Sequence, residues 1–142
     1  MAEKNKKLGR RIVEEFWNKR NPELINELYA PNCIIHTPDG ELKGLQGIRD
    51  LFDTYVTAFP DSRLEIEYML AEDDKVVTAY TFTGTHKGRL MDISPTGKQV
   101  TVRGTSVAQI KNDKVVEERD LWDTLSMMEQ LGAVPVHEHA WK

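Results

Sequence analysis

The densest group of side chains that could do acid–base chemistry lies at residues 116–123, Val-Glu-Glu-Arg-Asp-Leu-Trp-Asp. If this run is a strand, alternate side chains share a face, so Glu118, Asp120 and Trp122 point to the same side as Val116. Val116 and Trp122 are apolar and suit the interior, which would bring Asp120 inside with them. A carboxylate beside an indole and away from water has a raised pKa, and it can take a proton from a carbon next to a carbonyl. One interpretation of Asp120 is therefore a catalytic general acid and base.

The same spacing leaves a second interpretation of Asp120 open. The carboxylate could instead form an ion pair, buried or at a pocket rim, with one of three cations: Arg119, Arg103 or Lys111. Among the other acids of the run, we expect Glu118 to be a charge at the rim. Asp123 is expected to cap a following helix.

Histidine and aromatic side chains elsewhere could complete a pocket around Asp120. His36 lies in a predicted strand and His86 ends another, and each could donate a hydrogen bond to a ligand oxygen. A satisfied core or rim position remains the alternative for both histidines, as it does for Tyr55, Tyr68 and Tyr80. The predicted pocket residues are His36, His86, Phe16, Trp17, Leu51, Tyr55 and Trp122.

Metal and cofactor chemistry have little support in the sequence. His137, Glu138 and His139 have suitable types, but a usable site needs a third or fourth fixed ligand, so we expect an exposed tail and no metal. Glycine-rich phosphate loops and the G-x-S-x-G nucleophile motif are both missing, which predicts no cofactor and no acyl-enzyme. The single cysteine, Cys33, lies in an apolar segment and is expected to be a small core residue.

Four segments are expected to form the helices that position these residues. Apolar residues recur at helical spacing in residues 4–19 and 45–59, and Pro60 ends the second pattern. Pro22 suits the first turn of a shorter helix that ends before Pro31. Residues 124–131 form a last helix, with Gly132 as its stop.

The remaining segments have the two-residue period of strands. Leu64, Ile66, Tyr68 and Leu70 alternate with charged residues, which is typical of a strand with one wet face. Gly104 lies inside a later strand, where glycine often marks a bulge or a sharp bend. We expect an α+β fold in which a curved antiparallel sheet forms a cone, closed by N-terminal helices around a small-molecule pocket. The predicted strands are residues 33–37, 63–70, 76–86, 98–111 and 115–122.

Length and charge limit the organisation and the partners. The 142 residues fit one domain, residues 1–142. A net charge of -4 disfavours binding to phosphate backbones, so we expect no nucleic-acid partner. Neither a signal peptide nor an apolar run of membrane-spanning length occurs, so we expect a cytoplasmic protein with no membrane partner.

A series of short motifs, in this order and spacing, resembles the SnoaL-like polyketide cyclases, a family within the nuclear-transport-factor-two-like cone fold. The resemblance runs from about residue 7 to residue 132 and leaves residues 133–142 as a tail. The motifs are Phe16-Trp17-Asn18, Tyr29-Ala30-Pro31, Phe59-Pro60-Asp61, Gly84-Thr85-His86-Lys87-Gly88, Pro95-Thr96-Gly97-Lys98, Lys114-Val115-Val116-Glu117 with Asp120 and Asp123, and Gln130-Leu131-Gly132.

The resemblance implies a cofactor-free and metal-free enzyme of lyase or isomerase type. Such an enzyme closes a ring by intramolecular aldol condensation of a polyketide-like ester, and the family's acid–base aspartate matches Asp120. The best-understood cyclases also use a histidine on the preceding strand. Residues 104–110 contain no histidine, and Ala108 stands near that place, which leaves His36 and His86 as candidates from other walls.

Two other functions remain open. The same fold hosts unrelated functions, so the chain could be a non-catalytic module for small-molecule binding or oligomerisation. Epoxide hydrolysis, also known in this fold, would use an Asp-Arg-Asp arrangement. Arg103 and Asp120 are available for it, but Thr105 stands where the second acid is expected.

We also predict two kinds of partner. The ligand is expected to be a hydrophobic small molecule. The chain is expected to form a homodimer or tetramer through the open face of the sheet, with Val134, Val136 and Trp141 of the tail covering a partner. The expected outward residues of that face are Thr101, Arg103, Thr105, Val107 and Gln109.

Overall fold

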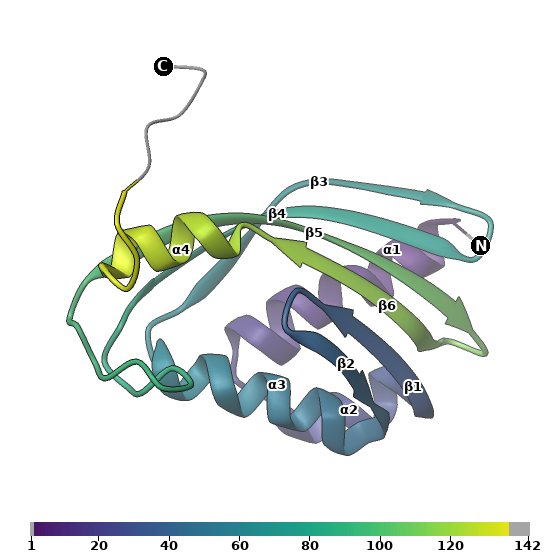
Figure 1. The fold of residues 1–142 in the computed structure, drawn as a ribbon. Coiled ribbons are helices and arrows are strands. Elements are labelled where there is room, and N and C mark those ends of the chain that lie inside the picture. The colour runs from purple at the N-terminus through teal and green to yellow at the C-terminus, as the bar shows by residue number, and fades with distance from the viewer. Residues whose placement is uncertain (1, 137–142) are drawn as a thin grey trace.

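Six strands form one curved sheet in the computed structural model, which describes residues 2–136 (Figure 1). The strand order is β2-β1-β6-β5-β4-β3, and the sheet does not close on itself. β3 to β6 form an antiparallel meander, with each strand paired to the next in sequence. The strands are β1 (Tyr29–Thr37), β2 (Gly40–Lys43), β3 (Arg63–Glu72), β4 (Lys75–Thr85), β5 (Gln99–Lys111) and β6 (Lys114–Trp122).

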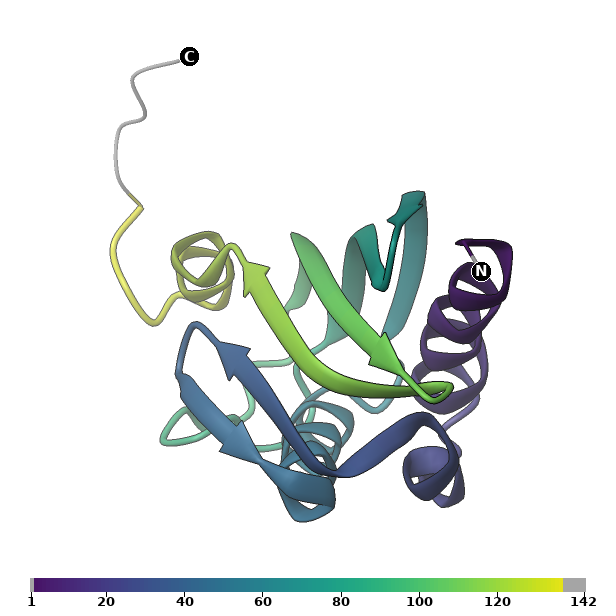
Figure 2. The same cartoon turned by 90° about the vertical axis from the view of Figure 1, so that its right-hand side faces the viewer.

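Helices cover the side toward which the sheet bends (Figure 2). The first helix and its continuation pack against β3 and β4, the third packs against β1, and the last packs against β5. The core lies between these layers, and its largest fully buried side chains include Tyr29, Phe16 and Phe59. No helix within residues 2–136 is long and apolar enough to cross a membrane. The helical segments are α1 (Ala2–Arg11), the π-helical η1 (Ile12–Asn18), the 3-10 turn η2 (Pro22–Leu24), α2 (Ile25–Leu28), α3 (Gly44–Ala58) and α4 (Thr124–Leu131).

The predicted α+β fold with a curved sheet is confirmed, and two features were not predicted. β2 is only four residues long and carries no apolar alternation, so local pattern gave no signal for it. β1 pairs with β6 in parallel, with Ile35 opposite Glu118, which makes the sheet mixed rather than wholly antiparallel. Such a pairing joins residues far apart in sequence, so local periodicity does not reveal it.

Two bulges change which side chains face inward from the pattern that simple alternation predicts. The β3–β4 register shifts between Ile66 and Tyr68, so Met69 is buried, while Tyr68 and Leu70 are 55% and 59% exposed on the other face. The β5–β6 register shifts in the same way at Val116. Val115 pairs with Ile110 and is fully buried, whereas Val116 had been expected to point inward. An extra residue reverses the alternation beyond it and bends the strand.

Gly104 lies in an unbroken stretch of ladder, so the expected bulge there is wrong. It pairs with Tyr80 on β4 and with Trp122 on β6. A Cβ at this position would lie only 2.4 Å from the Tyr80 hydroxyl oxygen. The glycine therefore leaves space for the Tyr80 side chain to lie over β5. Glycine at this position thus allows the tyrosine ring to approach the strand closely.

Polar contacts fasten the helical layer to the sheet. Arg20 has a left-handed backbone (φ 56°), and its guanidinium donates to the carbonyls of Trp17 (2.6 Å) and Ser62 (2.6 Å). The Asn18 side chain pairs with the Leu64 backbone in both directions, at 2.9 and 2.8 Å. These bonds hold the end of η1 against the start of β3 and fix the position of Trp17.

Candidate active site

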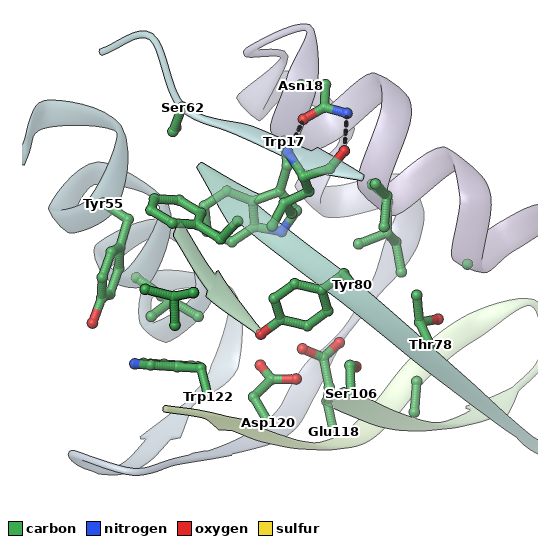
Figure 3. A pocket seen from close by; sticks show the side chains of 18 of the residues that line it. Trp17, Asn18, Tyr55, Ser62, Thr78, Tyr80, Ser106, Glu118, Asp120 and Trp122 are labelled. Atoms are coloured by element: carbon green, nitrogen blue, oxygen red, sulfur yellow. Dashed lines mark hydrogen bonds between the residues drawn. The ribbon is translucent and has the colours of Figure 1, made fainter. Parts of the chain in front are cut away.

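A cavity lies between the concave face of the sheet and the helices η1 and α3 (Figure 3). It measures about 110 Å³, several times the roughly 10–15 Å³ that one buried water needs, so it can admit an organic molecule. Trp17 lines it from η1, and Leu51 and Tyr55 line it from α3. Tyr55 packs edge-on against Trp122 with ring centroids 5.5 Å apart. Most of the lining is apolar or aromatic, as in typical small-molecule sites.

The register of the meander sets out the sheet side of the cavity in transverse rows. Because cross-strand partners share a face, each row brings three residues, one from each strand, to the inner side of the sheet. Every member of these rows except Gly104 lines the cavity. Across β4, β5 and β6 the rows are Val76–Ala108–Glu118, Thr78–Ser106–Asp120 and Tyr80–Gly104–Trp122.

Asp120 and Glu118 point into the cavity from adjacent rows of β6 (Figure 3). Each is only 7% exposed. Within the described residues neither carboxyl forms a salt bridge, because the nearby arginines lie on the outer face. Arg119 pairs with Glu117 at 3.5 Å and Arg103 with Glu67 at 3.9 Å. The expected alternative, an ion pair between Asp120 and one of its neighbouring cations, is therefore wrong.

Burial raises the pKa of both carboxyls. For Asp120, hydrogen bonds from Glu118 and Ser106 oppose the rise without cancelling it. For Glu118, burial and then the charge of Asp120 hold the pKa well above its usual range. The Tyr29 hydroxyl donates to Glu118 Oε1 at 3.5 Å, and Asp120 Oδ1 is buried without a hydrogen-bond partner in residues 2–136. The Tyr80 hydroxyl points toward both carboxyls (Figure 3). A buried acceptor left unpaired beside a cavity suits a polar ligand atom.

The structure brings together Asp120, Trp17, Leu51, Tyr55 and Trp122 of the predicted pocket. Phe16 does not belong to the lining, because it is fully buried behind the wall. It stacks on Phe52 at 4.8 Å and contacts Trp17 at 5.3 Å.

Both histidines lie outside the cavity, which corrects their assignment. Ile35 is buried, so the alternation of β1 turns His36 to the outer face, where its Nε2 bonds Glu117 at 2.7 Å. His86 is fully buried where β4 ends. Its ring lies 5.4 Å from that of Phe59, and its Nδ1 accepts the Thr96 backbone N–H at 3.2 Å. Burial lowers the pKa of His86.

Glu118 lies inside the cavity and not at its rim. It was expected at the rim, yet the alternation that carries Asp120 inward carries Glu118 inward too. Tyr80, for which a core position was the alternative to the pocket, lines the cavity, whereas Tyr68 is exposed on the other face. Asp123 caps α4 as expected, because its Oδ1 accepts the Ser126 backbone N–H at 3.0 Å.

The part of the chain that the structure describes contains no candidate metal site. In residues 2–136 no group of three His, Cys, Asp or Glu side chains could hold an ion. His137, Glu138 and His139 lie outside that part of the chain, as does Trp141.

Comparison with known proteins identifies first the fold of this chain and then its family. A protein from Jannaschia sp. CCS1, described as a proposed SnoaL-like polyketide cyclase, superposes with a TM-score of 0.87 at 21% identity, over 94% of this chain and 95% of that one. The family model described as SnoaL-like polyketide cyclase matches residues 7–131, and the chain belongs to this family. No curated protein matches the sequence significantly.

Two further solved structures are similar in sequence as well as fold. AclR from Streptomyces galilaeus, described as a proposed hydroxylase, has a TM-score of 0.86 and 28% identity, covering 97% of this chain and 87% of its own. A proposed polyketide cyclase from Acidithiobacillus ferrooxidans has a TM-score of 0.80 and 28% identity, covering 92% of this chain and 95% of its own.

Proposed function

We propose that the protein is a cofactor-independent enzyme of cyclase or isomerase type, in which Asp120 removes a proton from a carbon next to a carbonyl group. The observation that carries this proposal is the Asp120 carboxyl, buried in an apolar cavity with Oδ1 unpaired in residues 2–136. A desolvated carboxylate is a stronger base than one in water, because its pKa is raised. Membership of the SnoaL-like polyketide cyclase family supports the same chemistry.

The proposed reaction is an intramolecular aldol ring closure of a polyketide-like ester. Asp120 takes the proton from the activated carbon, the resulting enolate attacks a second carbonyl of the same molecule, and Asp120 returns the proton to the new alkoxide. Trp17, Tyr55 and Trp122 line the cavity and would contact an aromatic ligand. Holding both reacting carbons in one small cavity provides the orientation that ring closure needs.

Solvent-deuterium exchange tests the proposal without knowledge of the natural substrate. The probe is α-tetralone, a neutral aromatic ketone, and NMR follows loss of its C2–H signal in D₂O. Wild-type protein should accelerate exchange, and Asp120→Asn should remove at least 100-fold of that acceleration, since general acid–base groups contribute about 10²–10⁴. Asp123→Asn is the matched control, because it changes an aspartate outside the cavity that caps α4. Equal exchange by the wild type and Asp120→Asn would contradict the role of Asp120.

Two alternatives are separated by the same material. A non-catalytic binding module would show a rise in melting temperature with α-tetralone but no exchange above the buffer rate. Epoxide hydrolysis is not favoured, because Arg103 is exposed on the outer face, away from Asp120. Arg20, which does line the cavity, donates to backbone carbonyls instead.

We further propose that the chain forms a homodimer through the outer face of the sheet. Tyr68, Ala79, Thr105 and Leu121 are successive cross-strand partners from β3 to β6. Tyr68 and Leu121 are 55% and 69% exposed, so this row of four residues has an exposed apolar side chain at each end. Light scattering should give a dimeric or larger mass at micromolar concentration, and Leu121→Asp should lower it. Met91→Asp, at an exposed residue elsewhere, is the control. A monomeric wild type would refute this proposal.

The cytoplasmic location of the protein stays a prediction.

A further inference from the structure

Two carboxyl groups share the cavity without a cation to balance them. Glu118 and Asp120 are two residues apart on the same face of β6, and both are nine-tenths buried. Arg20, the one cation in the described lining, has its guanidinium bonded to the carbonyls of Trp17, Asn18, Pro60 and Ser62. The other titratable groups against the pair or along the cavity are Tyr29 and Cys33 from β1, Tyr55 from α3 and Tyr80 from β4.

None of these neighbours supplies a positive charge. Two ionised carboxylates at this site would therefore be two uncompensated buried charges side by side, and such an arrangement is strongly unfavourable. Two carboxyls that share a site resolve the conflict by keeping one proton between them, so the pair carries a single negative charge.

We propose that Glu118 is a second catalytic residue, which shares one proton with Asp120 and donates it to the carbonyl oxygen while Asp120 takes the proton from carbon. The inference rests on the proposed function for its chemical step. Asp120 is the base because the Ser106 hydroxyl and the Glu118 carboxyl both hydrogen-bond to it and stabilise its ionised form. Glu118 lies in the adjacent row, directed into the same space (Figure 3).

The proton balance closes over one cycle. Asp120 carboxylate takes the proton of the C–H bond, whose electron pair becomes the C=C bond of an enol, and Glu118 protonates the oxygen. The enol carbon then forms the new C–C bond to the second carbonyl, and the enol O–H proton returns to Glu118. Asp120 gives its proton to the new alkoxide. The pair and the substrate together carry a single negative charge at every stage, and the pair again holds one proton when the cycle ends, so the cavity never accumulates charge.

This arrangement also selects the class of ligand. A site with one fixed negative charge and no free cation in its described lining repels carboxylate and phosphate groups. The proposed substrate is therefore a neutral ketone or ester, with a carbonyl oxygen able to accept a hydrogen bond from Glu118. A free carboxylic acid, ionised at neutral pH, should bind at least 10-fold more weakly than its methyl ester.

The test of proton sharing does not depend on activity. Carbon-detected NMR of the wild-type protein should show the Glu118 carboxyl protonated at pH 7. In Asp120→Asn the Glu118 titration should move to lower pH, because the neighbouring charge is gone, while Asp123→Asn should leave it unchanged. A Glu118 carboxyl ionised at pH 7 in the wild type, or one that does not respond to Asp120→Asn, would overturn the shared proton.

The catalytic role is tested by α-tetralone exchange with Glu118→Gln, which keeps the shape and a hydrogen-bond donor but cannot release a proton. Exchange should fall about 100-fold, with the ligand-induced rise in melting temperature retained. The wild-type rate should also decline at alkaline pH as Glu118 loses its proton, and Glu118→Gln should lack that decline. If Glu118→Gln exchanges α-tetralone at the wild-type rate, the role of Glu118 is refuted and Asp120 is the sole acid–base group. If Asp120→Asn exchanges it at the wild-type rate, the proposed function itself is refuted.

Discussion

Replacing Gly104 with alanine should show how closely Tyr80 is fitted over the sheet. An added Cβ would lie 2.4 Å from the Tyr80 hydroxyl oxygen and 2.5 Å from Cζ. Non-bonded heavy atoms prefer about 3.5–4.0 Å, so the ring must move by about 1 Å or more. The movement would carry the hydroxyl away from the carboxyl pair that it now faces.

The size of the effect follows from two opposing terms. Forcing an extra carbon into a packed site costs about 1–3 kcal/mol. Alanine is otherwise favoured over glycine within a strand by roughly 0.5–1 kcal/mol. Gly104→Ala should therefore destabilise the wild type by about 1–2 kcal/mol. In a Tyr80→Leu background, where the crowding atoms are gone, the same change should stabilise the fold by about 0.5 kcal/mol.

Urea unfolding followed by tryptophan fluorescence measures all four proteins of this double-mutant cycle. Linear extrapolation gives each free energy of unfolding, and an unchanged slope shows that the unfolded state is comparable. The coupling energy between Gly104 and Tyr80 should be about 2 kcal/mol. If Gly104→Ala has the same effect in both backgrounds, the close approach of the tyrosine is not the reason for the glycine.

Two further predictions concern pH and helix capping. Folding raises the pKa of Glu118 and Asp120, so stability is lost as pH rises from the unfolded-state values near 4 up through the folded-state values. Glu118→Gln should lose less stability over that pH interval, which thermal unfolding at pH 4 and pH 8 will show. The same pH dependence in the wild type and in Glu118→Gln would contradict a buried Glu118 with a raised pKa. Asp123→Ala should destabilise the fold by about 1 kcal/mol by removing the cap on Ser126, whereas Asp123→Asn should be close to wild type in urea unfolding. Equal losses in both variants would show that the cap is not the cause.

Most of the fold follows from local sequence pattern, and the features that the pattern did not predict are two bulges, one short strand and one long-range pairing. Hydrophobic periods identified the long helices and the meander, because those elements bury one face each. The bulges at residue 67 and at Val116 could not be predicted from the sequence. The extra residue reverses the alternation beyond it, but no residue type marks the point where the reversal begins. β2 forms a short hairpin with its neighbour β1 and carries no apolar alternation, whereas the parallel pairing of β1 with β6 joins segments that are far apart in sequence.

The site was predictable to the extent that one strand carries it. Alternation along β6 correctly predicts that Asp120 and Trp122 point inward, and it places Glu118 on the same face. Its burial without a cation contradicts the general preference of charged residues for water, so residue type argued against it. Alternation along β1 would have turned His36 outward, because Ile35 beside it is fully buried. Nothing local distinguished a bulge from a close approach at Gly104.

The most direct test of the central claim is the carboxyl titration of Asp120 in the wild-type protein, measured by carbon-detected NMR with Asp120→Asn to assign the signal. The account predicts an apparent pKa above the model-peptide value of about 3.9, because burial disfavours the charge. A value at or below about 3.9 would contradict it, since it would mean that water or a cation reaches the carboxylate and that Asp120 is not a desolvated base.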